Sequence, residues 1–315
     1  MEGEGDLVIK SSYEKILELE TTAGSIEATV AYLVKQISGF LQTLEPVLIC
    51  YPDEGPASLG GIFKEAVLRC HASPVFCGTD FRWKTLLHAA FETHANTIVG
   101  HPLVMLGLMK LAKATSTPLY VYDVIACGDA FSHWIVTDLK KGLDCKVWGC
   151  YCVHSGPVVA GFSCEQEAGI HIREDVFLPT IEEVPELEGV LPKRGRLYFT
   201  STKDPELVYD PREVALVYSH RCSCGQETPR VVEANSVRND ELSRVVLEDT
   251  LLTWSSILDY RAEYTESGAA LELVVFPGES LPKLPSFAKL NVRPWNPEKD
   301  VPFCMEKYSL KIHEK

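Results

Sequence analysis

The sequence predicts an α/β protein in which a doubly wound, mostly parallel sheet is followed by a β-rich part and a small α+β unit. Short apolar runs alternate with amphipathic segments of helical length between residues 12 and 125. After about residue 145, short strand-like runs between loops replace this alternation. Beyond about residue 235, one helical segment precedes two strands and a proline-rich stretch.

The first part supplies the parallel sheet. Residues 12–40 place apolar side chains at helical spacing, and the apolar run 47–51 ends in a turn rich in proline and glycine, which is typical of a buried strand. The following segments are predicted to be helix 59–70, strand 74–77, helix 83–95, strand 97–99, helix 103–114 and strand 119–125. Such an alternation predicts a parallel sheet whose ligands bind beyond the carboxyl ends of the strands.

The second and third parts are read in the same way. The predicted elements are strands 158–160, 170–172, 197–200 and 214–218, then helix 244–252 and strands 260–264 and 270–276. We therefore expect a large N-terminal domain over residues 1–236 and a small α+β C-terminal domain over residues 237–315.

Charge and composition exclude several classes of function. The chain has 30 basic and 44 acidic residues and a net charge of −14, which disfavours binding to nucleic acid or to an anionic membrane. No apolar run is long enough to span a bilayer, and the acidic start lacks the features of a signal peptide. The 11 cysteines are an odd number spread over 315 residues. We expect a cytoplasmic protein with reduced thiols rather than a disulfide scaffold.

One segment carries a family resemblance. Residues 164–179 read C-E-Q-E-A-G-I-H-I-R-E-D-V-F-L-P, which resembles the C-x-x-Q-x-G-L-H-I-x-E-D-x-F-x-P signature of the phenylacetate–CoA ligase branch of the adenylate-forming enzymes. Residues 200–213, 222–230 and 302–311 resemble further motifs of that branch in the same order. The resemblance runs from about residue 16 to the C-terminus, and the chain looks like a shortened and diverged relative.

The resemblance implies a fold and a reaction. The fold is a large adenylate-forming N-terminal domain, doubly wound sheet plus β-rich part, with a small mobile C-terminal domain. In the implied reaction, an aryl or other small carboxylate attacks ATP in the presence of Mg²⁺, giving an acyl-adenylate and pyrophosphate, and the thiol of CoA then displaces AMP. Such catalysis depends on positioning and on neutralising charge around phosphates.

The resemblance also implies a nucleotide site. Thr22, Gly24 and Ser25 occupy the place of the phosphate loop, and the alternative is that Thr22 or Ser25 caps the next helix. Residues 127–130 (C-G-D-A) occupy the place of the adenine-side motif, which makes Gly128, Asp129 and Ala130 candidates; the alternative is a turn capped by Asp129.

A third motif departs from the family. Trp148 and Gly149 match the aromatic–glycine pair whose ring stacks on adenine, but Cys152 stands where the family has its magnesium-binding glutamate. A thiol is a poor ligand for Mg²⁺, which prefers oxygen donors. Glu165 or Glu167 could compensate.

Two further positions follow from the resemblance. Glu213 corresponds to the ribose-binding carboxylate, with Asp210 as a rival and a solvated loop carboxylate as the alternative. Lys307 corresponds to the catalytic lysine of the small domain, and an ordinary surface lysine is the alternative.

Sulfur and imidazole groups suggest a metal site. Cys164, His171, Cys222 and Cys224 offer a Cys₃His set, which suits structural Zn²⁺ because four protein ligands leave no open position. All four lie within the family motifs. Ordinary buried thiols with a satisfied histidine are the alternative, and His220 is another candidate for the fourth ligand.

The remaining cysteines carry less signal. Cys50, Cys70, Cys77 and Cys127 are expected to be core residues. The cluster of Cys145, Cys150, Cys152 and His154 offers a weaker second metal or nucleophile candidate.

Three functions remain open at this point. The first is an acid–CoA ligase that uses ATP, a small carboxylic acid and CoA. The second is a non-catalytic relative that binds a nucleotide or an acyl group, or serves as an accessory subunit. The third is a zinc-stabilised α/β domain without a nucleotide site. A homodimer and an accessory-protein partner both stay open.

Overall fold

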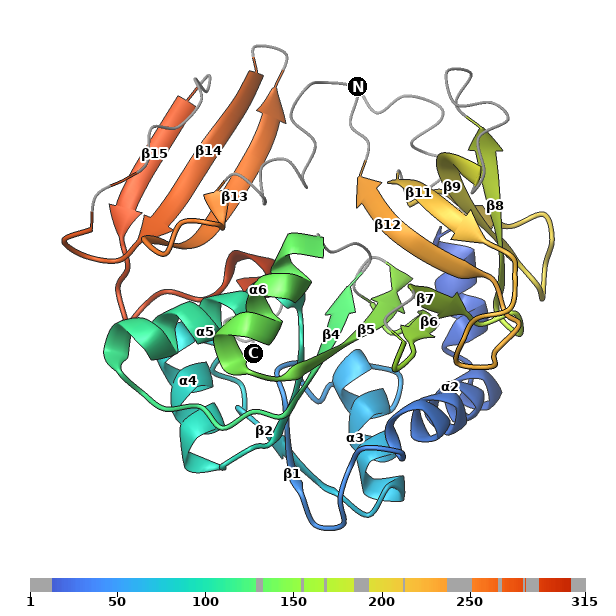
Figure 1. Ribbon diagram of the computed structural model, residues 1–315, viewed down its shortest axis with the longest axis horizontal. Helices are drawn as coiled ribbons and strands as arrows, with labels where there is room; N and C mark the ends of the chain where they lie inside the picture. Colours follow the sequence, from blue (N-terminus) through green and yellow to red (C-terminus); the bar gives the residue numbers. More distant parts are fainter. Residues whose placement is uncertain are drawn as a thin grey trace.

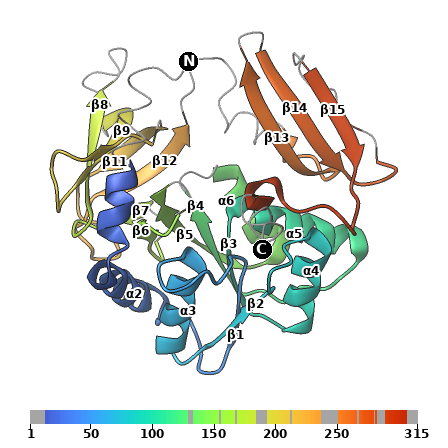
Figure 2. The ribbon, with the colours of Figure 1, turned by 180° about the vertical axis from the view of Figure 1, so that it is seen from behind.

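The computed structural model of the 315-residue chain describes residues 13–128, 133–153, 156–166, 169–183, 193–211, 213–236, 251–265, 268–279, 281 and 289–306. Figures 1 and 2 show the parallel strands and their helices below, with the β-rich strands and a separate three-stranded sheet on opposite sides above.

Five parallel strands form the centre of the molecule. They are β1 (Pro46–Ile49), β2 (Ser73–Phe76), β3 (Thr97–Gly100), β4 (Asp123–Gly128) and β5 (Lys146–Cys152). Their spatial order is β2-β1-β3-β4-β5, and every neighbouring pair is parallel. The order reverses after β1, as a doubly wound sheet requires.

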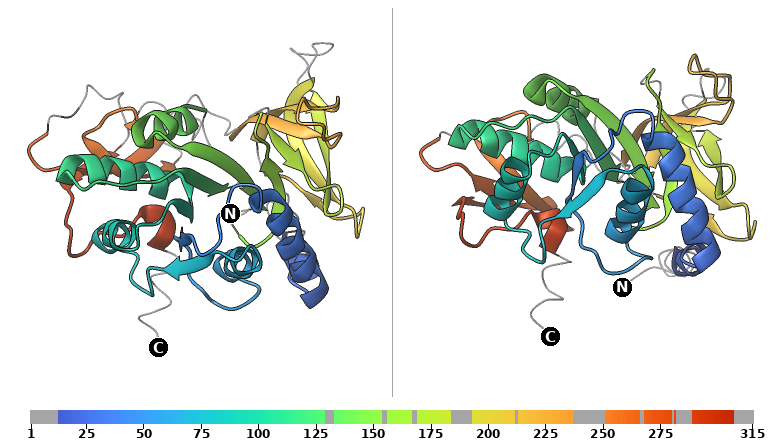
Figure 3. Two further views of the ribbon diagram at one scale, coloured as in Figure 1. Left: turned by 60° about the horizontal axis from the view of Figure 1, so that its bottom comes forward. Right: turned by 90° about the horizontal axis from the view of Figure 1, so that it is seen from below.

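Helices connect these strands and cover both faces of the sheet (Figure 3). They are α2 (Ala23–Ile37), α3 (Leu59–Arg69), α4 (Trp83–Glu92), α5 (Pro102–Thr115) and α6 (His133–Leu143). Helix α2 packs against α3, whereas α5 packs against both α4 and α6.

Antiparallel strands extend the same sheet beyond β5. They are β6 (Val159–Ser163), β7 (Ile170–Ile172), β8 (Phe177–Glu183), β9 (Lys193–Ser201), β10 (Val208–Tyr209), β11 (Glu213–Tyr218) and β12 (Arg230–Ser236). Their order from β5 is β6-β7-β12-β11-β9-β10, and β8 also pairs with β9. Because β5 pairs with parallel β4 on one edge and antiparallel β6 on the other, it joins the two halves.

A second sheet forms the C-terminal unit. It contains β13 (Ile257–Thr265), β14 (Gly268–Val275) and β15 (Lys289–Pro294), and a 3₁₀ turn follows at Phe303–Met305. Apolar residues of β13 and β14 belong to the same core as the parallel strands, whereas the β-rich half and the helix at 13–20 share a second core. The three-stranded unit is therefore packed on the parallel half.

The architecture confirms the predicted α/β class and the alternation of the first part. Some details differ. The helical segment 12–40 is broken before α2, and the strand predicted at 119–125 begins only at Asp123. The helix predicted at 244–252 lies outside the described residues except for its end, so that prediction is not tested. No helix in the described part is long and apolar enough to cross a membrane.

Candidate functional site: a thiol–imidazole cluster and the strand ends

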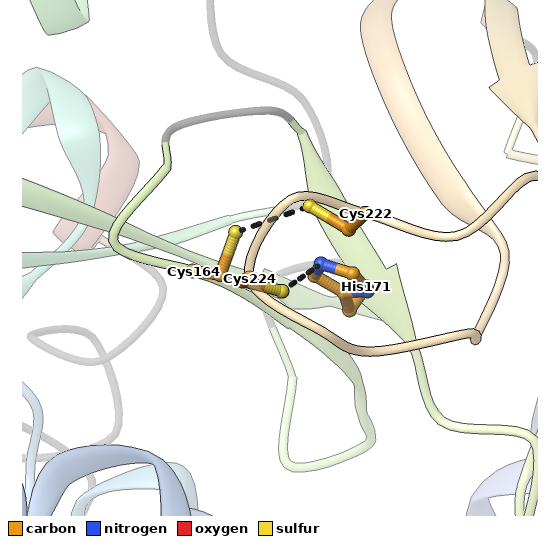
Figure 4. Close-up of side chains that lie close together, drawn as sticks. All are labelled: Cys164, His171, Cys222 and Cys224. Atoms are coloured by element: carbon orange, nitrogen blue, oxygen red, sulfur yellow. Dashed lines mark hydrogen bonds between the residues drawn. The ribbon is translucent and has the colours of Figure 1, made fainter.

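The four predicted metal ligands lie together. Cys164 follows β6, His171 lies on β7, and Cys222 and Cys224 lie in the loop between β11 and β12. The pairing of β7 with β12 brings these segments side by side, since Arg230 is the register partner of His171. Figure 4 shows the four side chains pointing toward one another.

The distances within this cluster match a tetrahedral metal site. The Sγ atoms of Cys164 and Cys222 are 3.8 Å apart, the Sγ of Cys224 lies 3.4 Å from the Nε2 of His171, and all four ligand atoms lie within 4.8 Å of one another. Bonds of about 2.3 Å from a tetrahedral Zn²⁺ to sulfur would hold two sulfurs about 3.8 Å apart. The donors therefore have the spacing that one ion requires.

The environment of His171 favours a ligand role. Burial and the nearby charge of Arg230 lower the pKa of the imidazole, so the ring is neutral at pH 7. Its Nδ1 contacts the hydroxyl of Thr228 at 2.9 Å, which leaves Nε2 directed at the thiols. A hydrogen bond to the second ring nitrogen commonly orients a histidine that binds metal.

The loop that carries Cys222 and Cys224 is a tight turn. Gly225 has a φ of 93°, and its N–H donates to the carbonyl of Cys222 at 2.9 Å. Burial raises the pKa of the Cys222 thiol, but hydrogen bonds from Cys224 and Cys164 outweigh it and bring the pKa to about 7. His220, the alternative ligand, lies outside the cluster and contacts the Nη2 of Arg230 at 3.1 Å.

The strands β4 and β5 carry the described adenine-side candidates. Gly128 ends β4, and Trp148 and Gly149 lie on the neighbouring β5. The ring of Trp148 stacks on Phe40 with centroids 4.5 Å apart, its Nε1 donates to Asp123, and the residue is only 6% exposed. Trp148 is thus a core side chain, and stacking on a base would require it to rearrange.

The phosphate-loop candidates lie in a different pocket. Thr22, Gly24 and Ser25 line a cavity of about 390 Å³ together with Lys203 and Arg173. The lining of this cavity includes none of Gly128, Trp148 and Gly149, the adenine-side candidates that the structure describes. Among the described candidates, the two groups therefore do not share this cavity.

Their local contacts support the capping alternative. Thr22 is the N-cap of α2 and accepts a hydrogen bond from the N–H of Ser25. The hydroxyl of Ser25 donates to the carbonyl of Leu19 and accepts from the Nζ of Lys203 at 2.7 Å. This lysine also pairs with the buried carboxylate of Glu20 at 2.9 Å.

The other candidates are only partly covered by the structure. Asp129, Ala130 and Lys307 lie outside the described residues, and Glu213 is described only as the first residue of β11. Asp210, the rival of Glu213, is buried and pairs with Arg196.

Sequence reasoning missed two features. Arg173, within the central motif, is buried; it contacts Thr29 of α2 at 2.9 Å and Asp175 at 2.6 Å, and so joins the two halves. Cys127, expected to be a plain core residue, lies with Cys150 and Cys152. The strand register, which pairs Cys127 with Cys150, is the information that would have placed these thiols together.

Comparison with known proteins finds relatives by structure and none by sequence. No protein-family model and no curated protein sequence matches the chain. Among solved structures, 2-hydroxyisobutyryl-CoA ligase in the postadenylation state aligns with a TM-score of 0.64 at 14% identity over 93% of this chain and 72% of that one. The chain has the fold of the adenylate-forming acid–CoA ligases.

Two further structures agree with this fold. The benzoate CoA ligase from Burkholderia xenovorans LB400 gives a TM-score of 0.54 at 9% identity, covering 84% of this chain and 62% of that one. The anthranilate CoA ligase solved with anthranoyl-AMP gives 0.55 at 9% identity, covering 91% and 63%. The chain spans between 60 and 72% of the length of the 2-hydroxyisobutyryl-CoA ligase in its different states.

Proposed function

We propose that the chain activates a small carboxylic acid with ATP and transfers the acyl group to CoA, with the ligands bound at the carboxyl ends of β4 and β5. The adenylate-forming fold, extending over most of the chain, is the observation that supports this proposal. Its structural neighbours were solved with acyl-AMP and with CoA. Gly128, at the end of β4, lacks a side chain that would obstruct a bound base.

A second candidate is a relative that binds nucleotide or acyl groups without catalysing adenylation. The specific observation in its favour is Cys152, which by resemblance takes the place of the magnesium glutamate. The thiol is fully buried beside two other thiols at the end of β5. Such a group cannot replace a carboxylate as a ligand of Mg²⁺.

Pyrophosphate release separates the two candidates. The purified chain is incubated with ATP, Mg²⁺ and a panel of small aromatic and aliphatic acids, with and without CoA. Acid-dependent pyrophosphate release, abolished in Lys307→Ala and retained in the neighbouring Lys311→Ala, is the expected result for a ligase. Binding of AMP by calorimetry without any pyrophosphate release supports the binding protein. Absence of both activity and nucleotide binding rejects the two candidates together.

We further propose that Cys164, His171, Cys222 and Cys224 hold one structural Zn²⁺. The donor set and its spacing fit this ion, and four protein ligands leave no position for a substrate. The ion would tie the end of β6 and the strand β7 to the loop between β11 and β12.

Metal analysis tests this assignment. We expect one equivalent of zinc bound through this cluster, lost in Cys224→Ala together with a lower melting temperature. Cys70→Ala is the matched control, because Cys70 is a half-buried thiol outside the cluster. Unchanged zinc content in Cys224→Ala would contradict the assignment.

A further inference from the structure

A second group of three thiols lies at the carboxyl ends of the parallel strands. Cys127 is on β4, and Cys150 and Cys152 are on the adjacent β5. Parallel pairing sets Cys127 opposite Cys150, and residues two apart on one strand point to the same face. The Sγ atoms of Cys150 and Cys152 are 3.7 Å apart, and the three sulfurs all lie within 4.8 Å of one another.

These sulfurs have the arrangement of ligands around one ion. A soft metal ion about 2.3 Å from each sulfur would separate them by about 3.8 Å. A single buried cysteine is usually a small apolar filler. Three cysteines converging from two strands are a different case, because their side chains meet at one point instead of spreading through the core.

The surroundings select the kind of ion. All three residues are 0% exposed, and within the described part of the chain no histidine, aspartate or glutamate adds a ligand atom to the group. Thiolates favour soft ions such as Cu(I) and, with a fourth ligand, Zn²⁺, whereas Mg²⁺ and Ca²⁺ need oxygen donors. Buried Arg173 supplies a positive charge that acts on Cys150.

We propose that Cys127, Cys150 and Cys152 form a second metal site, which binds one thiophilic ion at the carboxyl ends of β4 and β5. Cu(I) would be held by the three thiolates alone, and Zn²⁺ would need one additional ligand. The site does not depend on the proposed ligase activity. It is distinct from the Cys₃His cluster, with which it shares no residue.

Metal titration of the reduced full-length chain tests this site. The metal-free protein is titrated with Zn²⁺ and, separately and without oxygen, with Cu(I), and binding is followed by the ultraviolet thiolate-to-metal absorption. We expect two bound equivalents of the preferred ion in the unmodified chain. A Cys222→Ser/Cys224→Ser variant should retain one equivalent, with three sulfur ligands in X-ray absorption and, if the ion is Zn²⁺, one further ligand.

Variants of the three thiols give the complementary result. Cys150→Ala/Cys152→Ala and, separately, Cys127→Ala should lose this equivalent and retain the one at the Cys₃His cluster. Cys70→Ala and Cys145→Ala, which change half-buried thiols outside both groups, should retain both. Circular dichroism spectra matching that of the unmodified chain exclude misfolding as the cause of the loss.

Three outcomes would overturn the proposal. One is a single equivalent in the unmodified chain that disappears with Cys222→Ser/Cys224→Ser. Another is an absorption spectrum of that variant with fewer than three sulfur ligands on the ion. The third is that the folded variants Cys150→Ala/Cys152→Ala and Cys127→Ala bind as many metal equivalents as the unmodified chain. If the unmodified chain binds a single equivalent that survives in Cys222→Ser/Cys224→Ser, the zinc assignment of the Cys₃His cluster is rejected and this site stands, so the two proposals fail separately.

Discussion

The hydroxyl of Thr228 is the contact that fixes the ring of His171. It lies 2.9 Å from the Nδ1 atom, on the side away from the thiols. Removing such an outer partner weakens metal binding by about 10–100-fold, because the ring loses its orientation and its preferred tautomer. We therefore expect Thr228→Val to lower the zinc affinity of the Cys₃His cluster by about that factor, measured by competition with a chelator.

Thr202 provides the matched control for this prediction. Its hydroxyl also makes one hydrogen bond, to the carbonyl of Asp175, but lies outside the cluster. Thr202→Val should leave zinc affinity unchanged. Equal affinities in Thr228→Val and the unmodified chain would show that the hydroxyl does not orient His171.

At the residue scale, the sequence brought together the side chains of one thiol cluster and only part of the other. Cys164, His171, Cys222 and Cys224 are distinctive because thiol and imidazole groups fall within recognisable motifs. Cys127 has no such local signal. Its proximity to Cys150 arises from the register of two strands, which a single sequence does not specify. The weaker candidate cluster included Cys145, which lies outside this group of three thiols, and His154, which lies outside the described residues.

Helix α5 approaches α4 closely at a glycine. A Cβ atom on Gly107 would lie 2.1 Å from the Cη2 atom of Trp83, a buried and fully packed ring. Alanine is normally the better helix former, by about 1 kcal/mol. Overpacking costs about 1–3 kcal/mol. We expect Gly107→Ala to reduce the free energy of unfolding, as measured by urea denaturation.

Gly24→Ala is the control for the same substitution in a helix. No heavy atom lies within 4 Å of the position that its Cβ would take, so helix propensity acts alone. This variant should be as stable as the unmodified chain or slightly more so. If Gly107→Ala stabilises the protein as Gly24→Ala does, the contact between α4 and α5 at Gly107 has room for a methyl group, and the prediction is wrong.

At the element scale, hydrophobic patterning predicted the parallel half well and the later strands less well. The predicted start of β4 is too early, because Tyr120 and Tyr122 count as apolar residues in the pattern. In the structure their side chains are 68% and 63% exposed. Strand β15 escaped prediction because most of its residues are exposed or half-buried and lack the alternation of a buried strand. It forms by parallel pairing with β14.

A buried lysine attaches the C-terminal unit to the parallel half. The Nζ of Lys110, on α5, donates to the carbonyls of Leu252, Trp254 and Ile257 at 2.7, 3.0 and 2.8 Å. Lys110→Met keeps the apolar stem but leaves three carbonyls without this donor. We expect a loss of about 1–3 kcal/mol in the free energy of unfolding and faster proteolysis near residue 252. Lys113→Met, at an exposed position of the same helix, should change neither.

The same lysine makes stability depend on pH. Burial lowers the pKa of Lys110 to about 7, whereas in the unfolded chain it is about 10.4. Between these values the unfolded chain binds a proton that the folded chain does not, so this group makes the free energy of unfolding rise with pH. That rise should be missing in Lys110→Met. Parallel pH profiles of the two proteins between about pH 7 and pH 10 would contradict the prediction.

At the scale of the whole molecule, the sequence predicted the succession of parts but not how they share cores. Residue 236, after which we expect the domain boundary, is the last residue of β12, and the division into two domains stays a prediction. However, β13 and β14 share a core with the parallel strands. Contacts such as those of Lys110 join residues more than a hundred positions apart, and no local pattern specifies them.

Strand β5 has partners on both edges, parallel β4 and antiparallel β6. A fragment that stopped after residue 153 would keep the five strands β1–β5 of the parallel half but leave β5 with a row of unsatisfied backbone groups. A bare apolar edge of this kind recruits strands from other molecules. Truncating the protein between β5 and β6 should therefore yield aggregates, and a shorter fragment needs a different end point.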